Sequence, residues 1–196
     1  MIQNKKDLIE YLEADRLSLG RDTKRPSLQD IIWRYEIVLR KCEYYSNTSG
    51  GVIHKILLFY FKYRKYVLGM KCNYTICVNC FDKGLSLAHI GPVIVNSSAR
   101  IGVNCRIHVG VNIGTAAGTQ GEAPIIGDNV YIGPGAKIFG KITIGDNVAI
   151  GANAVVNKTF EDNNITIAGV PAKIINHNGS EGLLIKGSEM VNMDIL

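Results

Sequence analysis

Four histidines are the side chains best suited to acid–base chemistry in this chain of 196 residues: His54, His89, His108 and His177. A neutral imidazole can take a proton from a reacting hydroxyl group near physiological pH. His54 lies in a helical stretch and His177 in a tail rich in Gly and Asn, and we interpret both as surface residues. His89 and His108 lie in the middle of the chain and are the candidates for a catalytic base.

The cysteines raise the question of a metal site. Five are present, an odd number, and Lys5–Asp7 begin a charged stretch where a secretory signal would be apolar. We therefore expect free thiols in a reducing cytoplasm. Cys72, Cys77 and Cys80 have the spacing of part of an iron–sulfur site, and a Cys-x2-Cys pair can also bind zinc. No second pair follows, so we expect small buried thiols and no metal.

A repeat of six residues dominates the chain from about residue 99 onward. Its aliphatic positions form two runs: Ile101, Ile107 and Ile113, then Ile126, Ile132, Ile138, Ile144, Ile150 and Val156. Gly follows most of them, and a small or aliphatic residue lies two positions before eight of the nine. Between the two runs, residues 115–124 have the composition of a loop.

A period of six is neither helical nor a plain alternation of inward and outward side chains. It fits a triangular coil of three short strands, in which the aliphatic residues point inward and stacked coils bury one continuous column. The corners need tight turns, and Gly or Asn accepts the positive φ angles of such turns. The Asn candidates for these corners are Asn104, Asn112, Asn129, Asn147 and Asn153. The sequence therefore predicts a parallel β-helix.

The first third of the chain differs in charge and in periodicity. Residues 1–70 carry 13 basic and 8 acidic side chains and residues 71–196 carry 9 of each, so the net charge of +5 belongs to the first part. Apolar spacing predicts a helix around residues 8–12. Ser27–Asp30 resemble a capping box that opens a second helix, and a third helix is expected over residues 52–68.

The predicted third helix mixes aromatic and basic residues, which would suit a nucleic-acid or membrane surface. We interpret it instead as an amphipathic helix that packs on a neighbouring helix or a second subunit. The longest apolar run, Ile56–Phe61, is far too short to span a bilayer. The expected organisation is a helical segment over residues 1–70, a β-helix over residues 71–175 and a tail over residues 176–196.

The repeats, the loop after the third of them and Ala168–Ile174 together resemble the hexapeptide-repeat acyltransferases. Within that group, Leu87–Gly91, Ile94–Asn96 and Ile126–Gly140 are similar to serine acetyltransferases, and the similarity covers about residues 74–175. The resemblance implies a mainly β protein, a left-handed parallel β-helix with an N-terminal α-helical segment. It also implies an acyltransferase that moves acetyl from acetyl-CoA to an acceptor hydroxyl.

The resemblance assigns the catalytic base to His89, which would otherwise be a structural histidine at the corner of a coil. His108 stands where the regular repeat has Gly, and it either lines the same groove or is exposed. In this family a carboxylate from an earlier coil orients the base. Either Asn79 holds the place of that residue here or Asp82 does its work.

The resemblance also places the cosubstrate in a groove between two subunits. It therefore implies a homotrimer, and the helices of the family often pair trimers into a hexamer. The residues matched to the groove wall and to the CoA phosphates are Pro134, Ala136, Ala152, Lys158 and Lys173. As isolated cations, the lysines could equally be solvated surface charges.

Two departures from the serine acetyltransferase pattern concern the acceptor. The family has Asp before the catalytic histidine and an Arg–His pair before a Pro in the loop, which help hold the charged groups of the amino acid. The matching positions here are Ala88, Glu122 and Ala123. A sugar hydroxyl needs no Arg clamp. We therefore expect a cytoplasmic O-acetyltransferase that modifies a sugar in surface polysaccharide biosynthesis.

Two other interpretations stay open at this point. One is an L-serine O-acetyltransferase of cysteine biosynthesis, and the other is a non-catalytic hexapeptide assembly protein. A hexapeptide enzyme with a metal held by three histidines, such as a carbonic anhydrase, fits poorly because only His89 and His108 lie within the predicted β-helix. The basic helices could meet a second trimer or a membrane surface, and we expect no nucleic-acid partner.

Overall fold

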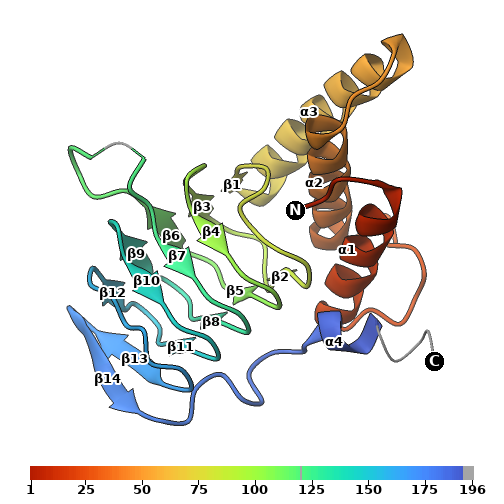
Figure 1. Cartoon of the computed structure of the whole chain (residues 1–196). Helices are drawn as coiled ribbons and strands as arrows, with labels where there is room; N and C mark the ends of the chain where they lie inside the picture. Colours follow the sequence, from red (N-terminus) through yellow and green to blue (C-terminus); the bar gives the residue numbers. More distant parts are fainter. Residues whose placement is uncertain (120, 192–196) are drawn as a thin grey trace.

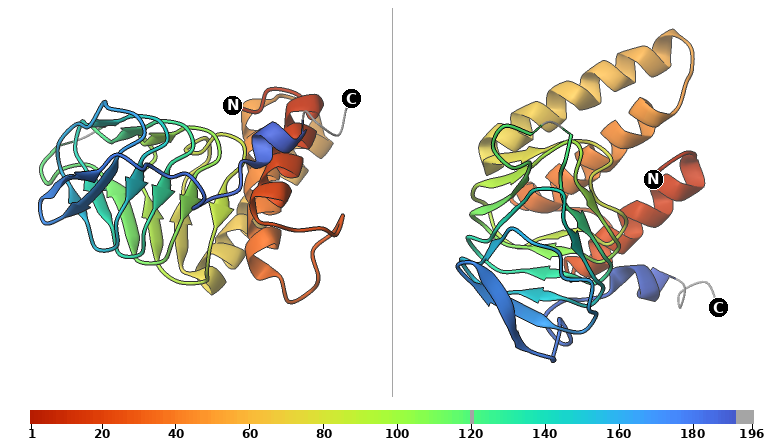
Figure 2. Two further views of the ribbon diagram at one scale, coloured as in Figure 1. Left: turned by 90° about the horizontal axis from the view of Figure 1, so that it is seen from below. Right: turned by 60° about the vertical axis from the view of Figure 1, so that its left-hand side comes forward.

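A computed structural model of the chain describes residues 1–119 and 121–191. Helices α1 (Lys5–Ser18), α2 (Ile31–Asn47) and α3 (Val52–Cys72) lie at one end of a prism of short strands (Figures 1 and 2). The strands are β1 (Tyr74–Ile76), β2 (Ser86–Leu87), β3 (Val93–Val95), β4 (Arg100–Ile101), β5 (Arg106–Ile107), β6 (Val111–Gly114), β7 (Ile125–Ile126), β8 (Tyr131–Ile132), β9 (Lys137–Phe139), β10 (Thr143–Ile144), β11 (Ala149–Ile150), β12 (Val155–Val156), β13 (Thr166–Gly169) and β14 (Ala172–Asn176). A short helix, α4 (Gly187–Val191), follows.

The prism is a left-handed parallel β-helix, as predicted. Sheet 1 has the order β1-β3-β6-β9-β12, sheet 2 the order β10-β7-β4, and sheet 3 the order β14-β13-β11-β8-β5-β2. Pairing within the sheets is parallel except between β13 and β14. Each coil contributes one strand or bridge to each sheet, so residues at equal positions of successive coils lie in line, about 4.8 Å apart.

The repeated aliphatic residues form the core of the prism, as the period of six predicts. From Ile101 to Val156, all nine are 4% exposed or less. Two positions before eight of them the residues are also buried, at 0–7% exposed: Ala99, Cys105, Val111, Val130, Ala136, Ile142, Val148 and Ala154. The prism is therefore closed by side chains along its length, and any ligand must bind outside it.

Four of the five predicted Asn corners adopt the left-handed conformation, with φ of 55–56° at Asn104, Asn129, Asn147 and Asn153. The carboxamides of three of them form a ladder, Asn104 to Asn129 at 2.8 Å and Asn129 to Asn147 at 3.0 Å. The prediction for Asn112 is wrong, because this residue lies inside β6 with its backbone N–H donated to the Ala136 carbonyl at 3.0 Å.

The helices differ from their predictions at the ends. Helix α2 begins one turn later than the Ser27 signal suggests, because Asp30 is its N-cap and accepts from the Trp33 N–H at 3.2 Å. Ser27 instead accepts from the Asp30 N–H at 3.2 Å and shapes the preceding turn. Helix α3 continues past residue 68 to Cys72, where Asn73 at φ 59° ends it and leads into β1.

A buried ion network joins the helices to the first coil. The Arg40 guanidinium, 0% exposed, donates to Asp15 at 2.7 and 3.2 Å and to Glu43 at 3.0 Å. It also donates to the carbonyls of Phe81 at 2.8 Å and Asp82 at 2.6 Å. All hydrogen-bonding directions of the planar fork are thereby used. The network fixes the coil that leads into β2 against α1 and α2.

Glu36 on α2 is a further buried carboxyl group at this junction. Its burial makes the stability of the folded chain depend on pH. One oxygen accepts from the Leu87 N–H at 2.9 Å, and the other has no hydrogen-bond partner in the described part of the chain. Burial, reinforced by the nearby Asp15 carboxylate, raises the pKa of Glu36 well above its usual range. The protonated form is thus favoured in the folded chain, whereas the unfolded chain ionises near the ordinary value. Stability from this group is present at acidic pH and is lost as pH rises.

We expect Glu36→Gln to raise the melting temperature by a few degrees at about pH 8 and to leave it nearly unchanged at about pH 4.5. Gln keeps the acceptor for Leu87 but cannot ionise. Thermal unfolding followed by circular dichroism at both pH values checks this. Glu122→Gln, at an exposed position, is the matched control with no such pH dependence. Equal effects of Glu36→Gln at the two pH values would contradict the assignment.

The tail returns along the prism to the helices, so that α4 packs beside α1 (Figures 1 and 2). Ser180 donates its N–H to the Asn147 carbonyl at 3.0 Å and its hydroxyl to the Asn129 carbonyl at 2.5 Å. Further on, the Ser188 N–H donates to the Asn104 carboxamide at 3.0 Å. The tail therefore follows the Asn ladder and ties both ends of the prism together. Residues 192–196 of the predicted tail lie outside the described residues.

The five cysteines are free thiols: Cys42, Cys72, Cys80 and Cys105 are buried, and Cys77 is half-buried. Within residues 1–119 and 121–191, no group of three or more His, Cys, Asp or Glu side chains could hold a metal ion. None of the helices in the described chain is both long and apolar enough to cross a membrane.

Candidate active site

The predicted base and part of the predicted CoA site lie along one corner of the prism, where the chain passes from sheet 3 to sheet 1. Leu87, Ile107, Ile132 and Ile150 are paired in register across sheet 3. The residues two positions later therefore stack on successive coils: His89, Val109, Pro134 and Ala152. We call this line the His89 edge. Three coil spacings separate its ends, about 15 Å.

The structure brings His108 beside His89. The two ring centroids are 5.8 Å apart, and the Tyr131 ring lies 5.1 Å from His108 on the other side. Nε2 of His108 is buried and has no hydrogen-bond partner among the described residues. Burial, together with the charges of Arg106 and His89, lowers the pKa of His108. The neutral imidazole is therefore favoured at His108, and its buried Nε2 is left without a partner among the described residues.

Tyr74 holds the backbone at His89, and sequence reasoning did not identify it. Its hydroxyl donates to the His89 carbonyl at 2.8 Å. Its ring lies edge-on to Tyr35 of α2, with centroids 5.1 Å apart. Burial raises the pKa of Tyr74, so the hydroxyl keeps its proton and remains a donor. Because Tyr74 precedes His89 by a whole coil, only the closed coil brings the two residues together.

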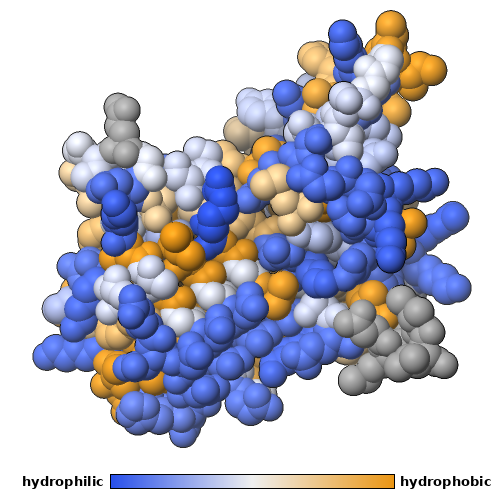
Figure 3. All heavy atoms as spheres, viewed as in Figure 1, coloured by the Kyte–Doolittle hydropathy of each residue, from blue (hydrophilic) through white to orange (hydrophobic). Residues whose placement is uncertain are grey.

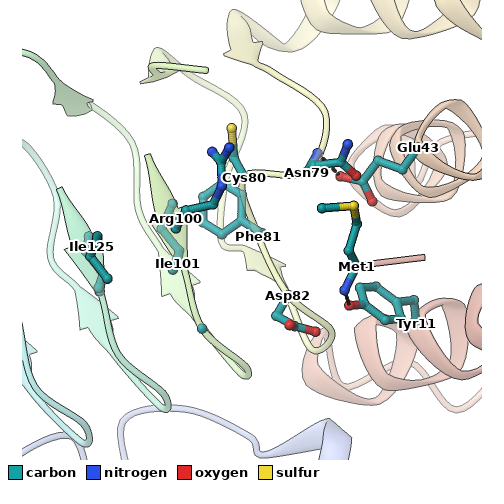
Figure 4. Close-up of a pocket in the computed structure, with 12 residues that line it drawn as sticks. Met1, Tyr11, Glu43, Asn79, Cys80, Phe81, Asp82, Arg100, Ile101 and Ile125 are labelled. Atoms are coloured by element: carbon teal, nitrogen blue, oxygen red, sulfur yellow. Dashed lines mark hydrogen bonds between the residues drawn. The ribbon is translucent and has the colours of Figure 1, made fainter. Parts of the chain in front are cut away.

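The two residues predicted to orient His89 lie elsewhere, and that prediction needs correction. Asn79 exchanges hydrogen bonds with Asn47 at 2.8 Å, and Asp82 accepts from the Lys83 N–H at 2.7 Å. Both line a cavity of about 300 Å³ between the helices and sheet 2 (Figure 4). They follow β1 by three to six residues, and the coil turns them toward α1 and α2. Their side chains therefore stabilise the junction with the helices.

The predicted CoA residues divide into three groups. Pro134 and Ala152 are exposed on the His89 edge. Ala136 is 0% exposed and points into the prism, so its prediction as a contact is wrong: its position belongs to the inward pattern of the repeat. Lys173 on β14 pairs with Ala168 near the end of the edge. Lys158 follows β12 on the next corner of the same protomer and lies over the Phe160 ring at 5.2 Å.

The positions that depart from the serine acetyltransferase pattern carry no cation for a carboxylate. The Ala88 N–H donates to the Ile107 carbonyl at 3.0 Å, next to His89. Glu122 is exposed in the loop between β6 and β7, and its carboxylate lies 3.8 Å from Lys141. Ala123 is buried at 8% exposed. Of the remaining histidines, His54 is bonded to the Tyr45 carbonyl at 3.0 Å and His177 is exposed beyond β14.

Comparison with known proteins agrees with this architecture. Residues 123–158 match the family model "Bacterial transferase hexapeptide (six repeats)", which defines the class of protein. A serine acetyltransferase of Staphylococcus xylosus is 36% identical over 148 residues, covering 69% of this chain and 67% of that protein. The chain belongs to the serine acetyltransferase family, and the predicted family is confirmed. A serine acetyltransferase of Synechococcus elongatus is 35% identical over 98 residues, which cover only 40% of that protein.

The solved structures that resemble this chain are also serine acetyltransferases. The crystal structure of serine acetyltransferase in complex with coenzyme A from Brucella abortus aligns with a TM-score of 0.68 at 26% identity, over 89% of this chain and 70% of that chain. Soybean serine acetyltransferase aligns with a TM-score of 0.71 at 25% identity, over 87% and 70% of the two chains. These relatives confirm the predicted class, an acetyl-CoA-dependent acyltransferase.

Proposed function

We propose that this chain transfers acetyl from acetyl-CoA to a hydroxyl group of a neutral sugar acceptor, with His89 as general base. We infer the reaction type from the exposure of His89, because an exposed imidazole can reach the hydroxyl of a bound acceptor. His89 takes the proton of the acceptor hydroxyl as its oxygen attacks the thioester carbonyl. The C–S bond then breaks, and the imidazolium returns the proton to the sulfur of CoA. The products are the acetyl ester and a free thiol.

His108 supports the acceptor side of this reaction. Its neutral imidazole can donate or accept a hydrogen bond but carries no charge that would attract a carboxylate. The Nε2 of His108 is buried beside His89 and lacks a partner among the described residues, so a sugar hydroxyl could bond to it once acceptor binding exposes it. We therefore assign His108 to acceptor positioning and His89 to proton transfer.

The acceptor-side charges support a sugar over free serine. Glu122 is a carboxylate where serine acetyltransferases carry an Arg, and Ala88 stands where they carry an Asp. A carboxylate in the loop repels the carboxylate of an amino acid, whereas a neutral sugar carries no charge for it to repel. The serine alternative is favoured by the names of the curated relatives, so it is the direct competitor in the experiment.

The CoA site supports assembly as a homotrimer. Pro134 and Ala152 line one exposed edge, whereas Lys158 of the same protomer lies on the next corner. A groove built from the His89 edge of one protomer and the next corner of its neighbour brings these residues together. We propose this arrangement for the pantetheine arm and the CoA phosphates, with cytoplasmic acetyl-CoA as donor.

Release of CoA thiol on adding acceptor tests the proposal, with L-serine compared against nucleotide sugars and oligosaccharides. We expect turnover with one of the sugars and kcat/KM for L-serine at least about a hundredfold lower, because the charged groups of serine lack partners here. Rapid turnover of L-serine would overturn the sugar assignment. Absence of CoA binding in calorimetry would favour a non-catalytic assembly protein instead.

A further inference from the structure

Helix α3 packs against α2, one of its two expected arrangements, and turns a second, apolar face to solvent. Eight large apolar side chains on this face are 46–75% exposed: Val52, Ile53, Ile56, Phe59, Tyr60, Tyr63, Tyr66 and Met70. We call them the α3 stripe. Most follow one another at alternating steps of four and three residues, so they share one side of the helix. The stripe is about 27 Å long at 1.5 Å per residue.

The opposite side of α3 accounts for the helix being stable in the protomer. Leu68, Gly69 and Cys72 are buried against α2 and β1, and Lys65 donates to the Ile76 carbonyl at 2.7 Å. The buried contacts of α3 thus lie on the side away from the stripe. Figure 1 shows α3 as an arm that projects beyond the prism, and Figure 3 shows apolar side chains gathered at its free end.

The charges around the α3 stripe have one sign. At 100° per residue, Lys55 and Lys62 fall on one side of the stripe, and Arg64 and Lys71 on the other. No Asp or Glu occurs between residues 44 and 81. An apolar, aromatic face bordered on both sides by cations is the pattern of a helix that lies in the plane of an anionic bilayer surface. The tyrosine hydroxyls suit the headgroup level.

A second copy of the chain fits the α3 stripe less well than an anionic lipid surface does. A two-fold contact through the stripe would bring the cationic borders of two α3 helices together. The region 44–81 offers no carboxylate to pair with them. We propose that α3 docks the protein on anionic lipid, with the stripe among the acyl chains and the Lys and Arg side chains on phosphates. The proposal is independent of the acceptor assigned above.

Co-sedimentation of the full-length protein with vesicles tests the docking. We expect binding to phosphatidylcholine vesicles containing 30% phosphatidylglycerol, much weaker binding to phosphatidylcholine alone, and release as NaCl rises from 0.1 to 0.5 M. The variant Ile56→Ser/Phe59→Ser/Tyr63→Ser should bind about tenfold or more weakly. All three side chains are exposed, so the variant keeps its circular dichroism spectrum.

A matched control and a direct contact probe complete the test. Val170→Ser/Ile174→Ser/Ile175→Ser removes three exposed apolar side chains at the other end of the prism and should leave vesicle binding unchanged. Phe59→Trp should show a blue-shifted emission, quenched by brominated lipid. No binding to anionic vesicles, or equal losses in the two triple variants, would overturn the proposal. So would a stripe variant that changes only the oligomeric mass, because the stripe would then be a contact between copies.

Discussion

Replacing His89 with Ala should lower turnover by about 10²–10⁴, the usual contribution of a positioned general base. The substitution removes the one imidazole that is exposed on the His89 edge in line with Pro134 and Ala152. Since His89 contributes no inward packing, we expect the fold and the affinity for CoA to stay unchanged. Initial rates of thiol release with the best acceptor, together with calorimetry for CoA, measure the two effects separately.

His108 provides the comparison that makes this prediction specific. We expect His108→Asn to raise KM for the acceptor more than it lowers kcat, because an amide still offers a neutral donor and acceptor. If His89→Ala keeps full turnover and His108→Asn loses it, the roles are exchanged. If neither variant loses turnover, proton transfer by a histidine of this edge is excluded.

Replacing Arg40 with Met should be the most destabilising single change at the helix–prism junction. Met fills much of the space of the Arg stem but leaves Asp15 and Glu43 buried without their cation. Breaking such a buried pair costs about 3–5 kcal/mol. For a chain of this length that corresponds to a fall of about 10 °C or more in melting temperature. Thermal unfolding followed by circular dichroism measures it.

The matched comparison for Arg40→Met is Lys141→Met, which breaks an ion pair whose side chains are 80% and 47% exposed. We expect a change within about 0.5 kcal/mol there, since exposed pairs are screened by solvent. In the Arg40→Met background, Asp15→Asn with Glu43→Gln should recover part of the lost stability by removing the unpaired charges. An Arg40→Met protein as stable as the parent would show that the network is energetically neutral.

Several features of the site were predictable because they depend on position in the repeat. Pro134 and Ala152 are 18 residues apart, three repeats of six, so the period places them on one edge. His89 was assigned from the family resemblance, and the register of β2 with β5 places it on the same edge. The same logic identified the error at Ala136, whose place two positions before Ile138 belongs to the interior. Helix ends were less predictable: Ser27 and Asp30 both offer a cap, and the packing of α2 selects Asp30.

The sequence by itself determined the β-helix, because inward aliphatic residues every six positions leave few other ways to bury one continuous column. It also determined which histidines share the repeat. The tertiary structure decided which groups meet across the junction: Tyr74 with His89, Arg40 with Asp15, and the tail with the Asn ladder. These pairs are separated by 15 to 51 residues along the chain. No local spacing encodes such contacts, since they depend on how the helices close against the first coil.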